Sequence, residues 1–363
     1  MTIDAFLREP IRRLSEVYDV HVMADFRSGE CPPGLEGIVS VIPMKIERKI
    51  APWRDIVALV RMVRYFRRHQ FPLVHSVTPK AGLLAMAAAS LAGIKIRIHT
   101  FTGQVWATRT GFSRLLLKSA DRCISLMTTD ILVDSHSQRR FLLQEGVVSE
   151  AKSNVLGEGS IAGVDTGRFR PDEKARARIR ETFSISDDES LFLYLGRLNR
   201  DKGLIELATA FGEIQDDRAH LMVVGPDEEG IAGMMAMLVG DKTERVHFVG
   251  YTDKPEEYYA AADVLCLPSC REGFGNVIIE AAAAGIPAVG SRIYGVVDAI
   301  VDNETGLLFE VRNAGELREC LSILCGNKAL RDRLGRRARE RVLASFTAGD
   351  LAAAWLSYYR ERL

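Results

Sequence analysis

The chain has 363 residues, of which 47% are hydrophobic and 26% charged, with 48 Lys and Arg against 48 Asp and Glu. This composition is typical of a globular protein and excludes collagen-like and disordered classes. The longest apolar stretch, residues 81–94, is shorter than the ~20 residues that cross a bilayer. The six cysteines form no CxxC pair and no zinc-ligand spacing, which favours free thiols in a reducing cytoplasm.

The charge is divided unevenly along the chain. The first 168 residues carry 23 basic and 16 acidic side chains, a net charge of +7, so the remainder has −7. A basic half favours an anionic surface as a partner. No nucleic-acid-binding motif appears, so we expect a membrane surface rather than nucleic acid.

Short β-branched runs alternate with helical patterns from end to end, which predicts an α/β protein with two parallel, doubly wound sheets. A Gly-rich stretch at 157–171 predicts the interdomain linker. The expected strands are Val20–Ala24, Ile38–Pro43, Leu73–Ser76, Lys95–Thr100, Ile131–Ser135, Ser153–Leu156, Leu191–Gly196, His220–Gly225, Val246–Gly250, Val264–Pro268, Ala288–Ser291 and Gly306–Phe309. The expected helices are 52–69, 80–92, 112–128, 137–145, 202–214, 228–239, 256–262, 276–284 and 314–325.

The strongest chemical signal is the Gly-rich loop and helix start in residues 271–280. A strand at Val264–Pro268 is followed by Glu272, Gly273, Phe274, Gly275, Asn276, Val277 and, within an apolar helix, Glu280. A helix N-terminus after glycines offers backbone N–H groups to a phosphate. A carboxylate in an apolar helix needs a polar partner such as a ribose hydroxyl. The alternative is a buried turn with two incidental carboxylates.

A second candidate site lies between an earlier strand and helix. Arg197 and Lys202 follow the strand Leu191–Gly196, and two cations there can neutralise a diphosphate without a metal. In isolation, the pattern is more typical of a solvated turn with ordinary surface charges.

Taken together, these motifs resemble glycosyltransferase family 4, the retaining enzymes of the GT-B fold. The elements that carry the resemblance are Gly-Arg-Leu-x-x-x-Lys-Gly at 196–203, Val-Val-Gly at 223–225, Val-x-Phe-x-Gly at 246–250, Glu272…Glu280 and Thr-Gly-Leu-Leu at 305–308. His99-Thr-Phe-Thr-Gly103 also resembles capsule and lipid-linked oligosaccharide transferases that use UDP-N-acetylhexosamines. At Asp298, where many members carry Glu, the chain departs from the pattern, so this residue is given no role.

The resemblance implies a GT-B fold of two Rossmann-like domains that face each other across a cleft. Residues 1–160 would bind the acceptor, residues 168–345 would bind the nucleotide sugar, and a C-terminal helix at 346–363 would cross back to the first domain. The family places a strand and a loop before the amphipathic helix that we expect at Ile3–Glu16. The first domain therefore lacks its first, central strand in this sequence, and we expect Met1 to lie roughly 15–20 residues after the true start.

The resemblance also assigns roles to residues. Arg197 and Lys202 would bind the donor diphosphate, Glu280 the ribose and Glu272 the sugar hydroxyls. His99 would reach the sugar from the opposite domain, although a single histidine at a strand end is more often structural. Backbone N–H groups from Gly273 to Val277 would bind sugar and phosphate oxygens.

The resulting hypothesis is a retaining, metal-independent glycosyltransferase without a cofactor. It would move a sugar, an N-acetylhexosamine, from a UDP-sugar to a polyprenyl-diphosphate-linked or polysaccharide acceptor. The alternatives are a UDP-sugar epimerase of the same fold and a degenerate, non-catalytic scaffold. In helix 52–69, Arg54, Arg61, Arg64 and Arg68 share one face. A second face, which is expected to pack inward, contains Ile56, Val60, Val63 and Phe66. That basic face favours docking on the inner face of the cytoplasmic membrane. The alternative is an ordinary solvated face.

Overall fold

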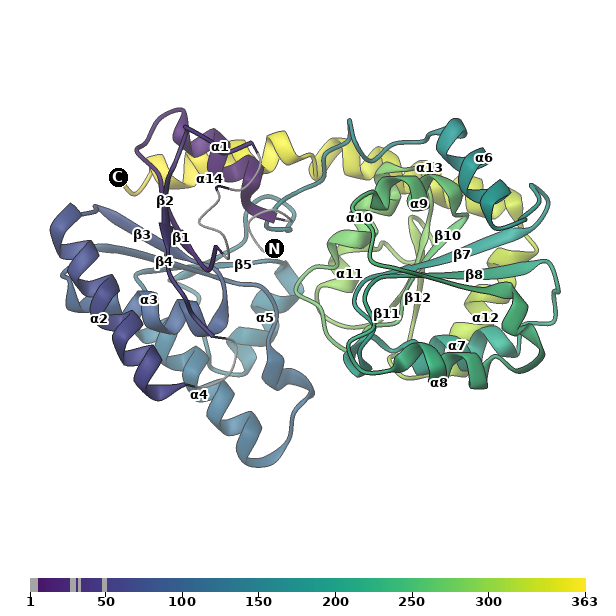
Figure 1. The fold of residues 1–363 in the computed structure, drawn as a ribbon, viewed down its shortest axis with the longest axis horizontal. Coiled ribbons are helices and arrows are strands. Elements are labelled where there is room, and N and C mark those ends of the chain that lie inside the picture. The colour runs from purple at the N-terminus through teal and green to yellow at the C-terminus, as the bar shows by residue number, and fades with distance from the viewer. Residues whose placement is uncertain (1–5, 27–30, 32–33, 48–50) are drawn as a thin grey trace. The chain divides into compact units, whose positions relative to one another are not determined.

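The computed structural model describes residues 6–26, 31, 34–47 and 51–363. The chain divides into two units (Figure 1): unit 1 comprises Met1–Gly163 and Ala348–Leu363, and unit 2 comprises Val164–Thr347. The boundary lies inside the Gly-rich stretch 157–171, but this stretch is not simply a solvated linker. Val164 pairs with Thr347 in an isolated β-bridge, and both Val164 and Phe169 are buried in the core of unit 2.

Unit 1 contains two parallel sheets. One consists of β1 (His21–Ala24) and β2 (Ser40–Pro43), and the other has the order β3 (Leu73–Ser76), β4 (Ile96–Phe101), β5 (Asp130–Val133), β6 (Ser153–Asn154). Among the residues that the structure describes, no strand pairing joins β1 to β3. In this part of the chain, the β1–β2 pair and the β3–β6 sheet are therefore separate sheets.

The helices of unit 1 cover both sides of the β3–β6 sheet. Figure 1 shows α2 (Pro52–His69), α3 (Pro79–Leu91) and α4 (Gly111–Met127) on one side, and α1 (Arg8–Ser15) beside α14 (Ala348–Arg360) on the other. Helix α5 (His136–Gln144) follows β5. Leu14 of α1 is buried in one cluster with Trp355 and Leu356 of α14. Ile3 of the expected first helix lies outside the described residues.

The buried face of α2 differs from the expectation. Ala58, Met62 and Phe66 are the buried residues, spaced four apart on one stripe, and they share a core cluster with α3. Of the residues expected to pack inward, Phe66 does so, but Ile56 and Val60 are exposed. That part of the prediction is wrong, because the helix carries two apolar stripes and only one of them faces α3.

Unit 2 contains one six-stranded parallel sheet with a core cluster on each face. The strand order is β12 (Gly306–Phe309), β11 (Ala288–Ser291), β10 (Val264–Leu267), β7 (Ser190–Leu195), β8 (Ala219–Val224), β9 (Val246–Gly250). Its helices are α6 (Glu173–Thr182), α7 (Leu204–Gly212), α8 (Ile231–Leu238), α9 (Pro255–Ala261), α10 (Asn276–Ala283), α11 (Val296–Ala299), α12 (Ala314–Cys325) and α13 (Lys328–Ser345). Sequence reasoning did not anticipate α6, the short α11 or α13.

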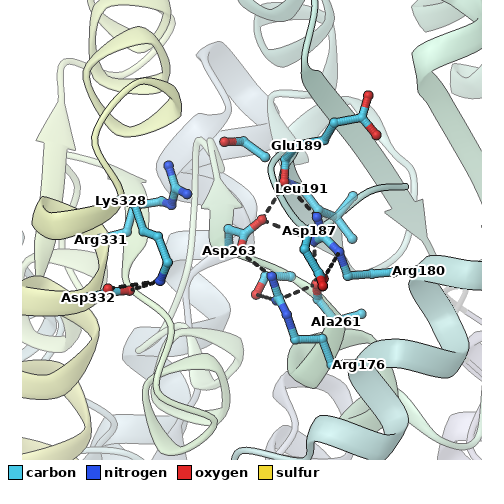
Figure 2. Close-up of polar contacts among 12 residues, drawn as sticks. Arg176, Arg180, Asp187, Glu189, Leu191, Ala261, Asp263, Lys328, Arg331 and Asp332 are labelled. Atoms are coloured by element: carbon cyan, nitrogen blue, oxygen red, sulfur yellow. Dashed lines mark hydrogen bonds and ion pairs between the residues drawn. The ribbon is translucent and has the colours of Figure 1, made fainter. Parts of the chain in front are cut away.

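A buried ion-pair cluster attaches α6 to the sheet at the amino ends of β7 and β10 (Figure 2). Arg180 is almost completely buried, and its Nη1 lies 3.2 Å from Asp263 Oδ2. The Asp263 carboxylate also accepts a hydrogen bond from Nη2 of Arg176 at 2.9 Å and one from the backbone N–H of Leu191 at 2.7 Å. Because every charge here has a partner of opposite sign or a carbonyl, the cluster can remain ionised in the interior.

Candidate active site

The site candidates of unit 2 meet where the strand order reverses. From β7 the chain continues outward to β8 and β9, and it then returns to place β10 on the other side of β7 before β11 and β12. In open parallel sheets, ligands bind at the carboxyl ends of the strands at this reversal. The loop after β7 carries Arg197 and Lys202, and the loop after β10 carries Glu272 and the glycines. Residues about 70 positions apart are thus brought to one edge.

Close backbone packing places Lys202 beside the second loop. Gly203 has φ +67°, and a β-carbon there would lie 2.0 Å from the Pro268 carbonyl oxygen, so a side chain has no room. With the two loops in contact, Lys202 Nζ donates to Glu272 Oε1 at 2.5 Å. Both side chains are largely buried, which strengthens their attraction relative to an exposed pair.

The second cation has a different partner. Arg197 Nη1 lies 3.1 Å from Glu228 Oε2, with both side chains near half exposure. A surface pair of this kind contributes little to stability, so Arg197 can change partner at low cost. Glu228 was not predicted, because a single acidic residue in a loop gives no sequence signal.

Helix α10 begins at Asn276, directly behind Gly275, which has φ +85°. Gly275, at the N-cap position, has no side chain to cap the helix, and helix N-termini attract anions through their dipole and N–H groups. Phe274 is buried, and its ring lies 5.3 Å from that of Phe346. Of the predicted binding residues, Phe274 can therefore offer only its backbone to a ligand.

Sequence reasoning did not identify Gly295, a glycine that allows two loops of this region to pack closely. A β-carbon at Gly295 would lie 2.4 Å from the Gly273 carbonyl oxygen, so the turn before α11 contacts the Gly-rich loop closely. The signal that could have revealed it is the Tyr294-Gly295 turn directly after a predicted strand.

Glu280 lies one turn further along α10. Its Oε2 accepts a hydrogen bond of 2.7 Å from the Tyr259 hydroxyl of α9. Burial raises the pKa of Glu280 to about 7, because a desolvated carboxylate loses hydration. Among the described residues, no other group donates a hydrogen bond to the Glu280 carboxylate. Its second oxygen can therefore accept a hydrogen bond from a ligand hydroxyl.

His99 lies in unit 1 and is completely buried. Its Nδ1 lies 2.8 Å from Ser76 Oγ, and its ring fills the space above Gly82 of α3, where a β-carbon would lie 2.4 Å from Cε1. Burial lowers the pKa of His99 to about 3, so the ring is neutral. The expected contact with a sugar stays a prediction: the ring is enclosed within unit 1, and its Nε2 has no hydrogen-bond partner among the described residues.

Sequence reasoning also missed a buried polar network near His99. His75 bonds Thr100 Oγ1 at 2.7 Å through Nε2 and the Tyr359 hydroxyl at 2.7 Å through Nδ1. Burial raises the pKa of Asp134, at the end of β5, to about 8. In the part of the chain that the structure describes, no group of three His, Cys, Asp or Glu side chains is arranged to hold a metal ion.

Comparison with known proteins agrees with this architecture. Two family models match: "Glycosyl transferase 4-like domain" over residues 5–156 and "Glycosyl transferases group 1" over residues 175–341. The capsular polysaccharide biosynthesis glycosyltransferase CapM of Staphylococcus aureus is 31% identical over 315 residues, which cover 86% of this chain and 82% of CapM.

Two solved structures have a similar fold. Sucrose-phosphate synthase of Thermosynechococcus elongatus superposes with a TM-score of 0.82 at 24% identity, covering 98% of this chain and 92% of that one. The structure of Anabaena HepE in complex with UDP and glucose superposes with a TM-score of 0.81 at 17% identity. The match covers 98% of this chain and 95% of the HepE chain.

The fold and the family matches together define a class: this protein is a glycosyltransferase with the GT-B fold. The chain belongs to the family of group 1, type 4-like glycosyltransferases, and it is a hexosyltransferase.

Proposed function

We propose that the protein transfers a sugar, an N-acetylhexosamine, from a UDP-sugar to a polyprenyl-diphosphate-linked or polysaccharide acceptor, with retention and without a metal ion. The observation that carries this proposal is the Lys202–Glu272 pair, 2.5 Å apart, beside the start of α10 directly after Gly275. A cation, a helix N-terminus and a carboxylate are thereby collected at the edge where a nucleoside diphosphate would bind.

The proposed roles follow from where charge develops during transfer. The departing UDP gains negative charge, which Lys202, Arg197 and the N–H groups at the start of α10, in residues 273–277, stabilise. The second oxygen of Glu280 accepts from the ribose, and Glu272 accepts from sugar hydroxyls. The leaving phosphate takes the proton of the acceptor on the same face of the sugar, so no residue is assigned as a covalent nucleophile.

His99 acts differently in this proposal from the catalytic role expected at first. Its neutral ring joins Ser76 of β3 to its own strand β4 and packs on α3. We therefore treat it as a positioning residue that holds the carboxyl ends of β3 and β4 in register.

The donor and acceptor classes have separate support. HepE was solved with UDP and glucose, and CapM is named for capsular polysaccharide biosynthesis. We extend a UDP-sugar donor and a polysaccharide-pathway acceptor to this chain on the strength of these relatives and of the His99–Gly103 motif.

A screen of UDP-sugars against sugar-diphosphate-polyprenol and polysaccharide acceptors tests the proposal. We expect UDP release that depends on the acceptor, a product one sugar heavier by mass, and an α-anomeric product from an α-linked donor by NMR. UDP release with epimerised sugar and no acceptor would identify the alternative epimerase. A folded protein that binds no UDP by calorimetry would identify a scaffold.

We also propose peripheral membrane docking through α2, in which Arg61, Arg64 and Arg68 face anionic lipid. None of the described helices is both long and apolar enough to span a bilayer. Reversal of the three arginines to Glu is expected to release the protein from anionic vesicles while UDP binding is retained. Unchanged sedimentation with vesicles at low salt would contradict this docking face.

A further inference from the structure

The first residues of unit 2 hold an arginine in a fixed position beside the proposed donor site. Oδ1 of Asp165 accepts hydrogen bonds from the backbone N–H of Gly167 at 2.9 Å and of Arg168 at 3.1 Å. The Asp165 carbonyl accepts one from the N–H of Phe169 at 2.8 Å. Val164 and Phe169 are buried in the core of unit 2. The backbone of Arg168 is therefore anchored on both sides, although this stretch was expected to be a linker.

The Arg168 side chain binds the beginning of α9. Its Nε donates to Glu256 Oε2 at 2.9 Å, and its Nη2 donates to the Asp253 carbonyl at 2.9 Å. Nη2 also lies 2.7 Å from Glu256 Oε2. The guanidinium thus holds both the first turn of α9 and the loop before it. Because both side chains are partly exposed, this pair contributes little to stability, and a further role for its geometry can be considered.

Helix α9 connects this ion pair to Glu280. Glu256 and Tyr259 are three residues apart, so they lie on the same face of α9. The Tyr259 hydroxyl donates to Glu280 Oε2 at 2.7 Å, and α9 lies next to α10 (Figure 1). The Phe169 ring packs edge-on against Tyr259, with ring centroids 5.7 Å apart. Residues 168–169, α9 and α10 therefore meet around one buried carboxylate.

The charges of the Arg168–Glu256 pair act on Glu280 in opposite directions. Burial has the largest effect and raises the pKa of Glu280 to about 7. The hydrogen bond from Tyr259 and the positive charge of Arg168 lower this pKa, and the negative charge of Glu256 raises it. Arg168 thus favours the ionised form of Glu280, whereas Glu256 favours the protonated form.

The other charged residues packed against α10 bind elsewhere. From α13, Arg339 donates to the Ala283 carbonyl, and Arg341 donates to the carbonyls of residues 298 and 299. Neither arginine acts on Glu280, and neither does Asp298 of α11. Within the part of the chain that the structure describes, Arg168 is the only cation whose charge acts on Glu280.

We propose that Arg168 is a positioning residue of the donor site, which keeps Glu280 ionised and able to accept hydrogen bonds from a donor hydroxyl. An ionised carboxylate has only acceptor oxygens, and its hydrogen bonds are stronger than those of the neutral acid. The inference rests on the ribose-binding role of Glu280 proposed above. It adds that the first residues of unit 2 set the charge of the residue that binds the ribose, without touching the ligand themselves.

The pH dependence of stability tests this coupling without any ligand. Each protein is compared with its own Glu280→Gln counterpart in thermal melts from about pH 4 to 9. The contribution of Glu280 falls as the pH rises and stops changing above its pKa in the folded state. Arg168→Ala should raise the pH of this end point by about half a unit or more, and Glu256→Gln should lower it.

Two variants separate the charge of Arg168 from its contacts. Arg168→Lys keeps the charge and should leave the end point near the wild-type value. Arg178→Ala is the matched control, because Arg178 of α6 pairs at 3.0 Å with Glu257, the next residue of α9. Neither Arg178 nor Glu257 acts on Glu280, so the end point should not move. Glu256→Gln retains the guanidinium and keeps the test available if Arg168→Ala does not fold.

Calorimetry with UDP then connects the coupling to the donor. The midpoint of the UDP affinity profile against pH should move upward in Arg168→Ala and downward in Glu256→Gln, as in the melts. UDP itself titrates, so the comparison is made between variants and not on the wild-type profile alone. Arg178→Ala should give the wild-type profile.

Equal end points in the wild type, Arg168→Ala and Glu256→Gln would overturn the proposal. So would a loss of melting temperature in Arg168→Ala that is the same at every pH, since that result identifies a purely structural clamp. Shifted end points in the melts with an unshifted UDP profile would support the coupling and contradict the ribose-binding role of Glu280. Failure of this inference and failure of the proposed function are thus read from different measurements.

Discussion

Replacing Lys202 by Ala tests the proposed donor site most directly, because the structure links this side chain to a second site residue. Lys202 and Glu272 form a largely buried pair with Nζ and Oε1 2.5 Å apart. A bound diphosphate would compete with Glu272 for the ammonium group. Loss of one charge-assisted hydrogen bond costs about 1.5–3 kcal/mol, so we expect the Kd for UDP to rise about 10- to 150-fold.

The carboxylate that remains contributes to this loss. Without Lys202, Glu272 is an uncompensated negative charge beside the site, and it repels the diphosphate. The double variant Lys202→Ala/Glu272→Gln should therefore bind UDP more tightly than Lys202→Ala alone. Glu272→Gln by itself should preserve or improve UDP binding, since it frees Lys202, but it should weaken the binding of the UDP-sugar because Glu272 is proposed to hold the sugar.

Isothermal calorimetry with UDP and UDP-sugars on the four proteins measures this cycle. Arg200→Ala is the matched control: Arg200 lies in the same turn, η3 (Arg200–Lys202), but is highly exposed, and its loss should change the Kd less than twofold. Wild-type affinity in Lys202→Ala would refute the donor site, as would a double variant that is no tighter than the single one.

Three further outcomes are expected. The pKa of Glu280 is raised from 4.5 to about 7, so between these pH values the folded state holds more protons than the unfolded state. The contribution of Glu280 to the free energy of unfolding therefore falls as the pH rises from 4.5 to 7. Glu280→Gln should remove this slope in thermal melts, and wild-type UDP affinity should rise as pH passes 7, because the ionised form is the better acceptor from a ribose. Asp263→Ala, far from the site, should cost about 3–5 kcal/mol in denaturant unfolding by leaving Arg180 buried without its partner; a change below 1 kcal/mol would contradict the buried-cluster account. EDTA should leave transfer unchanged, and complete loss restored by Mg²⁺ or Mn²⁺ would contradict the metal-independent mechanism.

Much of the architecture is determined locally, and the sequence by itself was sufficient for it. All twelve expected strands are present to within a few residues at their ends. Short β-branched runs that are bounded by glycines and separated by helical patterns are typical of buried parallel strands. The ordered loop motifs were sufficient to show the resemblance to glycosyltransferase family 4, and the GT-B fold that this resemblance implies is the fold found. Helices α6 and α13 were missed because their apolar stripes are narrow. In α13, only Leu334, Gly335, Ala338 and Val342 are buried among many arginines.

The tertiary structure decided which residues meet and which are covered. Periodicity shows that α2 has apolar faces, but only the position of α3 determines that Met62 is buried and Ile56 is not. A histidine at a strand end looks the same in sequence whether it faces a ligand or a core; the close approach of Gly82 encloses His99. The Lys202–Glu272 pair likewise depends on β7 and β10 lying side by side, since long-range strand pairing brings together side chains that no local pattern relates.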